Sequence, residues 1–289
     1  MFPAAFDYLR AHSIEEAAAA LSQHGGDARI LAGGQSLIPA MRFRLARPTV
    51  LVDIGSLRDL VYLREESGFL RVGAMTTDAR LERDKDVRAR YALLTETSDV
   101  VADPVVRHKG TVVGSLCHND PAGDWAAAAL ASRAIMVVRG PSGERDVPID
   151  EFIVDSFTTA VQEGEIAVEV RFPTPSARTS GAYEKIERKV GDYATAAAAV
   201  QLTLADDGTI AQAGVAITAL GPFAMRVTEA ERLLLGQRPS EDLFRAAAEE
   251  AYRLADPNPD TRGSAEYKKN MARILVARGL ARTSSKLHA

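Results

Sequence analysis

The sequence predicts an α+β protein, and two observations lead to that prediction. Residues 1–56 alternate short apolar runs with helix-like runs, which indicates a compact β-α-β-α-β unit. Residues 176–289 instead place three strand-like runs ahead of three helix-like runs, the order expected of a small α+β domain. Residues 57–175 mix both patterns, so we expect two linked N-terminal units followed by a third.

The first unit is expected to begin with an extended piece at residues 8–10. Ser13 then has the features of a helix N-cap, because Glu15 and Glu16 follow it in the first turn. A Gly-Gly pair at residues 25–26 ends that helix. The remaining elements are a strand at 28–32, a helix at 37–43 and a buried strand at 48–54.

The second unit is expected to open with a hairpin, since strand-like residues 60–64 and 69–72 flank a short polar turn. The elements expected next are helices at 77–81 and 91–100, a glycine-bounded loop at 107–124, a helix at 125–132, and strands at 134–139 and 166–172. A stretch rich in Pro, Ser and Thr at 173–180 is expected to link this unit to the third.

The third unit is expected to contain a three-stranded antiparallel sheet followed by helices. Asp206, Asp207 and Gly208 form a hairpin signal between two of the strands. The strands are expected at 182–189, 195–204 and 210–220, and the helices at 225–235, 240–254 and 264–280. The polar tail at 282–289 is expected to fray.

Charge and composition exclude several classes of function. A net charge of −4 argues against nucleic acid or an anionic membrane as a partner. No apolar run reaches membrane-spanning length and no signal peptide is visible, so a cytoplasmic location is expected. Cys117 is the single cysteine and the five histidines are scattered, so no disulfide, iron–sulfur cluster or other metal site is expected within this chain.

The first candidate binding element surrounds a glycine pair. Its residues are Ala32, Gly33, Gly34, Gln35, Ser36 and Leu37. Adjacent glycines allow positive φ and a close approach of a ligand to the main chain. The residues after them begin a helix, where unpaired N–H groups suit a phosphate. Taken alone, this turn is a weak signal, because a glycine pair is more often an ordinary strand-to-helix connection.

The second candidate element is the loop at 110–124. Its candidate residues are Thr111, Gly114, Ser115, His118, Gly123 and Asp124. Hydroxyl groups beside a glycine, followed by a sharp turn ending in a carboxylate, would clamp a pyrophosphate and a sugar-like chain. Two such loops suit a dinucleotide, although neither the Rossmann nor the P-loop motif is present. His118 has an alternative interpretation as a loop residue without acid–base duty, and Cys117 as a small buried residue.

Lys185 and Tyr193 have no functional assignment from the residues alone. A lysine on a strand is usually solvated, and a tyrosine after Gly-Asp usually packs in a turn.

Together these segments resemble the FAD-binding medium subunit of the aerobic carbon monoxide dehydrogenase and xanthine dehydrogenase family of molybdenum hydroxylases. The residues that carry the resemblance are Ala32-Gly33-Gly34-Gln35-Ser36, those at 110–115 and 120–124, Lys185, and Asp192-Tyr193-Ala194. The resemblance covers nearly the whole chain. It implies a two-part FAD-binding domain of the vanillyl-alcohol-oxidase (PCMH) type at 1–56 and 57–175, and a C-terminal flavoprotein domain at 176–289.

The resemblance also implies roles for the candidate residues. Both glycine-containing elements would donate to the FAD pyrophosphate, and Asp124 would fix the polar chain of the cofactor. Lys185 would lie near the flavin, and Tyr193 would pack against the isoalloxazine ring. No catalytic residue is expected in this chain, because the resemblance implies that the substrate is oxidised on another subunit.

The implied partners are a small subunit with [2Fe–2S] clusters and a large subunit with the molybdenum cofactor, in a dimer of heterotrimers. Electrons would pass from the clusters through FAD to an external acceptor. The alternative is a stand-alone flavin-dependent oxidase or reductase of the same fold. The last third has no histidine before His288, which disfavours that alternative.

Val113 departs from the family pattern, in which a glycine stands at this position. A β-branched residue resists positive φ, so either this position takes an ordinary extended conformation or the loop is reshaped and FAD affinity falls. Of the two, the prediction is a strained loop and weakened FAD binding. The same departure is the only argument for a third reading, a flavin-free subunit kept for assembly.

Overall fold

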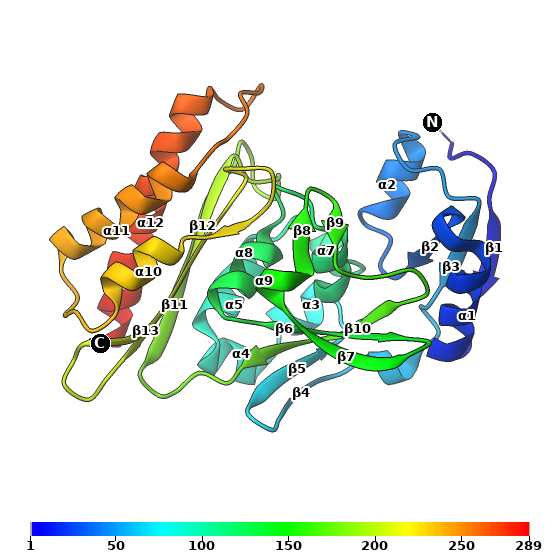
Figure 1. Cartoon of the computed structure of the whole chain (residues 1–289), viewed down its shortest axis with the longest axis horizontal. Helices are drawn as coiled ribbons and strands as arrows, with labels where there is room; N and C mark the ends of the chain where they lie inside the picture. Colours follow the sequence, from blue (N-terminus) through cyan, green and yellow to red (C-terminus); the bar gives the residue numbers. More distant parts are fainter. Residues whose placement is uncertain (1, 289) are drawn as a thin grey trace.

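The computed structural model describes residues 2–288. The three units follow one another along the longest axis, from the blue N-terminal unit through the green middle unit to the orange and red C-terminal helices (Figure 1). Within the described residues, no helix is both long enough and apolar enough to cross a membrane.

The first unit is a parallel three-stranded sheet, in the order β1 (Asp7–Arg10), β3 (Val50–Asp53), β2 (Ala28–Leu31). Parallel neighbours need crossover connections, and helices α1 (Ile14–His24) and α2 (Leu37–Arg42) lie in them. Ser13 caps α1 as predicted, accepting a hydrogen bond from the Glu16 N–H at 3.1 Å. This arrangement places the glycine pair at the carboxyl end of β2, where chain direction changes.

The middle unit is an antiparallel five-stranded sheet in the order β4-β5-β10-β6-β7, with a small β8-β9 ribbon beside it. Its strands are β4 (Leu63–Glu66), β5 (Phe69–Gly73), β6 (Ile135–Gly140), β7 (Gly143–Pro148), β8 (Ile153–Asp155), β9 (Thr158–Thr159) and β10 (Ile166–Pro173). Its helices are α3 (Asp78–Glu82), α4 (Lys85–Arg90), α5 (Ala92–Val100), α6 (Pro104–Arg107), α7 (Val112–His118), α8 (Asp124–Ala131) and α9 (Ile149–Phe152).

The segment expected as a loop at 107–124 therefore contains a helix. Helix α7 occupies its centre, which corrects the sequence-based expectation. Glycine and hydroxyl residues gave this segment the composition of a loop, but Thr111 acts as an N-cap by accepting a hydrogen bond from the Gly114 N–H. Val112, Val113 and Leu116 then face the core of the middle unit and hold the helix there.

The C-terminal unit contains the three long antiparallel strands expected, β11 (Thr179–Ile186), β12 (Ala196–Leu204) and β13 (Ile210–Thr218). A short fourth strand, β14 (Met225–Arg226), extends this sheet at the position where a helix start was expected. The helices are α10 (Thr228–Leu234), α11 (Glu241–Leu254) and α12 (Ala265–Leu287).

Helix α12 continues through most of the tail that was expected to fray. Arg282 and Lys286 both pair with Glu96 of the middle unit, and Thr283 and Ser284 are buried. These long-range contacts explain why local composition gave the wrong expectation for residues 282–287. Ala289 lies outside the described residues.

Strand β12 is shared by two hydrophobic cores. Ala197 and Ala199 belong to the core of the first two units, whereas Ala196 and Ala198 belong to the core of the C-terminal unit. Side chains alternate between the faces of a strand, so one face of this sheet packs against α5 and α8 and the other packs against α10 and α12 (Figure 1). The sheet therefore packs directly against α8, the helix that begins with Asp124.

Candidate functional site

The glycine pair forms a tight turn between β2 and α2. Gly34 has φ of 74°, in the left-handed region that a side chain resists. Its carbonyl accepts a hydrogen bond from the Ile38 N–H at 3.0 Å. Gly33 is constrained by space instead, because a Cβ atom there would overlap the carbonyl group of Lys109. The two glycines therefore serve different purposes, one conformational and one steric.

The two candidate loops are in direct main-chain contact. An ideal Cβ on Gly33 would also lie 3.0 Å from the Cα of Gly110, and the Gln35 side chain approaches Gly110 from the same turn. Gly110 is fixed in turn by its carbonyl, which accepts from the Asp78 N–H at 3.0 Å. Residues distant in sequence thus form one continuous backbone surface.

Unpaired N–H groups begin the helix that follows each loop. Within residues 2–288, the N–H groups of Gln35, Ser36 and Leu37 donate no hydrogen bond, and the same is true of Val113; the N–H of Val112 instead lies in a β-bridge between Thr77 and Thr111. Main-chain donors without protein acceptors are suited to an anionic group. Glycine is required at residue 114, because a Cβ atom there would lie 2.6 Å from the Thr111 hydroxyl oxygen that caps the helix. Ser115 is half-buried in the same helix.

Val113 does not strain this site. It lies within α7, outside the residues with positive φ, and its side chain is buried in the core. The prediction that valine strains the loop is therefore wrong, because the backbone conformation it assumed is not present. A helical valine at this position contributes apolar packing, and the argument for a flavin-free subunit loses its basis.

Asp124 begins α8 and is buried beside two groups from β11. The Tyr183 hydroxyl donates to Oδ1 at 2.8 Å, and the Lys185 ammonium donates to Oδ2 at 3.0 Å. Burial raises the pKa of Asp124, while the positive charge of Lys185 opposes that rise. Gly123 precedes it as the N-cap of the helix.

Lys185 is not the solvated strand residue that the residues alone suggested. Its side chain is 3% exposed, and it also donates to the Val100 carbonyl at 3.0 Å and lies 3.3 Å from Glu187. The ammonium is surrounded by acceptors of this chain. Sequence reasoning missed this because Asp124 stands far away along the chain and becomes a neighbour only when the third unit docks.

Tyr193 lies in the connection between β11 and β12 with 47% of its surface exposed. Partial burial raises the pKa of its hydroxyl, as do the negative charges of Asp120 and Asp124 in the second loop. Arg262 holds this connection by donating to the Tyr193 carbonyl at 2.9 Å and pairing with Asp192 at 3.0 Å. No local sequence signal distinguishes Arg262 from a surface arginine.

His118 packs against an aromatic neighbour. Its ring centroid lies 5.2 Å from that of Phe157, and Nε2 is 3.8 Å from Asp120. Burial lowers the pKa of the imidazole, which favours the neutral ring near pH 7. The arrangement fits the alternative interpretation of a residue without acid–base duty. Among the described residues, no group of His, Cys, Asp and Glu is arranged to hold a metal ion.

Asp78 lies against the second loop, although sequence reasoning did not identify it. Its carboxylate is buried against the second loop, where it accepts from Trp125 Nε1 at 2.9 Å and leaves no room for a side chain at Gly110. Burial raises its pKa to about 7. In the sequence it resembles any acidic residue in the first turn of a helix, so no signal separated it from the others.

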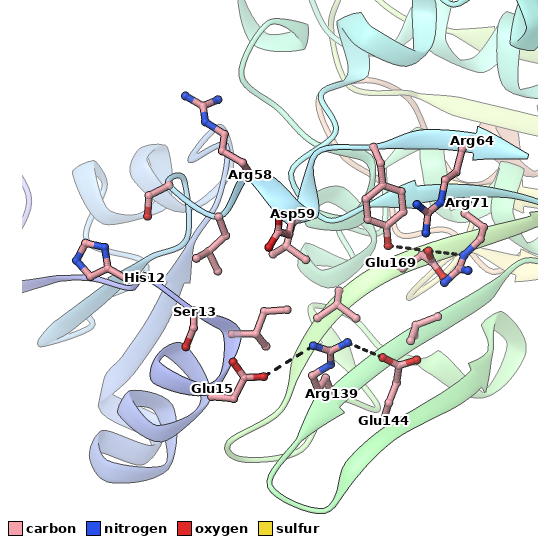
Figure 2. Close-up of a pocket in the computed structure, with 17 residues that line it drawn as sticks. His12, Ser13, Glu15, Arg58, Asp59, Arg64, Arg71, Arg139, Glu144 and Glu169 are labelled. Atoms are coloured by element: carbon pink, nitrogen blue, oxygen red, sulfur yellow. Dashed lines mark hydrogen bonds and ion pairs between the residues drawn. The ribbon is translucent and has the colours of Figure 1, made fainter. Parts of the chain in front are cut away.

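A polar cavity of about 560 Å³ lies apart from these loops, between the start of α1 and the sheet of the middle unit (Figure 2). Glu169 accepts from the Tyr62 hydroxyl at 2.6 Å and from Arg71 at 2.7 Å, and Arg139 pairs with Glu144 at 2.9 Å. Its acidic and basic side chains neutralise one another. None of the candidate residues lines this cavity.

The candidate residues form a surface with the chemistry of a dinucleotide site. Adjoining loops with unpaired main-chain donors suit a diphosphate, and the half-exposed ring of Tyr193 suits a flat heterocycle. The steric demand at Gly33 and the conformational demand at Gly34 exclude side chains from the backbone surface. The residues present therefore fit FAD.

Comparison with known proteins agrees with this chemistry. The family described as the FAD binding domain in molybdopterin dehydrogenase matches residues 4–175, and the CO dehydrogenase flavoprotein C-terminal domain matches residues 181–283. The carbon monoxide dehydrogenase medium chain of Hydrogenophaga pseudoflava is 40% identical, covering 97% of both chains. Subunit alpha of the 6-hydroxypseudooxynicotine dehydrogenase complex of Paenarthrobacter nicotinovorans is 36% identical, covering 98% of this chain and 95% of the relative.

The fold agrees equally well with a solved structure. A carbon monoxide dehydrogenase from Hydrogenophaga pseudoflava, in a form that lacks the Mo-pyranopterin moiety of its molybdenum cofactor, contains a chain that superposes with a TM-score of 0.96 at 41% identity, covering 99% of both chains. The protein therefore belongs to the family of FAD-binding oxidoreductase subunits that includes the medium chain of carbon monoxide dehydrogenase.

Proposed function

We propose that this chain is the electron-transferring subunit of a multi-subunit molybdenum hydroxylase. The observation that carries the proposal is the main-chain contact between the loops at Gly33 and Lys109, which brings the unpaired N–H groups at the start of α2 beside the start of α7. When bound there, FAD would accept single electrons from the [2Fe–2S] clusters of a partner and deliver them to an external acceptor.

The residues of this chain bind and orient the cofactor in this proposal. The N–H groups that follow Gly34 and Thr111 would hold the pyrophosphate. Asp124 would fix the polar chain, with Lys185 beside the flavin, and Tyr193 would cover the ring. His118, Ser115 and Leu37 would line the same surface. No residue of this chain is assigned to substrate oxidation.

The proposed partners are a small [2Fe–2S] subunit and a large subunit with the molybdenum cofactor, assembled in the cytoplasm as a dimer of heterotrimers. Relatives named as a medium chain and as a complex subunit support an assembly of this kind. A single cysteine also leaves this chain without the thiolates that such clusters need. These two relatives are named after enzymes of different substrates, so we propose that the large subunit, and not this chain, determines the substrate of the complex.

Purification of the native complex tests this proposal. The purified material is expected to show a flavin absorbance band, to release FAD and not FMN in acid, and to contain a small iron-bearing chain and a large molybdenum-bearing chain. A native complex without flavin would refute the cofactor assignment. Substrate-dependent dye reduction by a monomer of this chain alone would favour the stand-alone oxidase instead.

A further inference from the structure

The C-terminal sheet forms hydrogen bonds with the turn at residues 121–124. Thr218, the last residue of β13, places its hydroxyl oxygen 2.8 Å from the Pro121 carbonyl oxygen and 3.0 Å from that of Gly123. Its single proton is donated to one or the other. The N–H of Ala219 donates to the Pro121 carbonyl at 2.8 Å.

A second strand of the same sheet holds the end of this turn. Tyr183 and Lys185, both on β11, bind the two carboxylate oxygens of Asp124. The turn makes fewer hydrogen bonds within itself than with the sheet. The N–H of Ala122 donates to the Asp120 side chain, and the N–H of Gly123 donates to the Asp120 carbonyl. The position of the turn therefore depends on a unit that begins more than fifty residues later in the chain.

Neither Thr218 nor Tyr183 is placed to touch a ligand through its exposed surface. Thr218 is 0% exposed and Tyr183 is 5% exposed. Whatever they contribute to binding must act through the turn. Holding a loop in its bound conformation reduces the ordering cost that binding would otherwise carry.

We propose that Thr218 and Tyr183 are positioning residues, through which the C-terminal sheet sets the FAD affinity of the 121–124 turn. The inference rests on the proposed FAD-binding function. It goes beyond that function by assigning part of the affinity to two buried side chains that have almost no surface with which to contact the cofactor.

Substitution of Thr218 in the full-length chain tests the inference. Thr218→Val keeps the volume and the β-branch but removes the hydroxyl, so FAD affinity, measured by titrating FAD into apoprotein, is expected to fall about tenfold. Thr218→Ser restores the hydroxyl and is expected to bind FAD within about twofold of wild type. Thr203→Val is the matched control, because Thr203 on β12 loses a comparable 2.8 Å hydroxyl contact, to Thr179, away from the turn.

Three results would overturn the inference. One is unchanged affinity in Thr218→Val beside a wild type that binds FAD, and another is an equal loss in Thr203→Val. A wild type that binds no FAD would refute the proposed function and this inference with it. If Thr218→Val does not fold, Tyr183→Phe replaces it, since it removes only the hydroxyl that binds Asp124; unchanged affinity in that variant would count equally against the inference.

Discussion

Gly33 lies so close to the carbonyl group of Lys109 that no side chain fits between the two candidate loops. The closeness is a property of the main chain on both sides, so rotation of a side chain cannot relieve a clash there. Any Cβ atom at residue 33 must separate the loops.

Gly33→Ala is therefore expected to lower FAD affinity by at least about tenfold while the fold survives. The measurements are an FAD titration and a far-ultraviolet circular dichroism spectrum. Gly26→Ala is the control, because a Cβ there meets no atom within 4 Å and Gly26 is outside the positive-φ set. Stoichiometric FAD in Gly33→Ala would show that the loops tolerate separation and that their contact is only structural.

Gly34→Val is expected to lose FAD for a conformational reason. Gly34 has a φ of 74°, which is costly for a β-branched residue, so valine would change the backbone conformation of the turn. Gly236 has the same φ of 74° with open space around it, far from the loops in sequence. Gly236→Val should therefore lose a similar amount of stability, by about 1–2 kcal/mol, without losing FAD. Equal FAD loss in both variants would attribute the effect to general destabilisation.

Val113→Gly is expected to destabilise the protein without tightening FAD binding. Removal of a buried valine costs about 1.5–3 kcal/mol in apolar transfer, and glycine within a helix adds about 1 kcal/mol. A lowered thermal midpoint with FAD affinity equal to or below that of wild type is the expected result. Tighter FAD binding in this variant would revive the idea that valine strains the loop.

Asp78 is expected to make stability depend on pH. The native state holds its proton up to a pKa of about 7, whereas the unfolded chain releases it near the ordinary value of 3.8. The contribution of Asp78 is therefore fully present below pH 3.8 and is lost as the pH rises to about 7, a difference of roughly 4 kcal/mol.

Denaturant unfolding of wild type and Asp78→Asn across this pH range measures that contribution. Asparagine can still accept from Trp125 but does not titrate, so the stability of wild type relative to the variant should fall between pH 4 and pH 7. The same substitution at the fully exposed Asp206 is the control. A pH-independent difference between wild type and Asp78→Asn would contradict the assignment.

Local signals in the sequence were sufficient for most helix starts and for the first loop. Ser13 caps α1 as predicted, and the helices expected from residues 240 and 264 begin there, each capped by the serine hydroxyl oxygen. Gly34 adopts positive φ, as a glycine pair after a strand suggested. These features depend on residues within a few positions of one another.

Features that depend on distant residues could not be predicted in this way. Helix α7 was read as a loop because its buried valines are recognisable only once the sheet beneath them exists. Lys185 was read as solvated because Asp124, its partner, comes from another unit. No local sequence pattern marks Asp78, Thr218 or Arg262. The role of each residue can be recognised only from a contact that forms in the folded chain.

The alanines of β12 bear on how such subunits could be recombined. Ala197 and Ala199 face one hydrophobic core, and Ala196 and Ala198 face the other, so substitutions in this strand affect the packing of both cores. A chimera that grafts the C-terminal unit of one relative onto the FAD-binding unit of another would have to reproduce small side chains on both faces. A single larger residue on the inner face would press on α8, the helix that begins with Asp124. Exchange of cofactor-binding units between relatives is thus limited by a strand that lies outside the cofactor-binding unit.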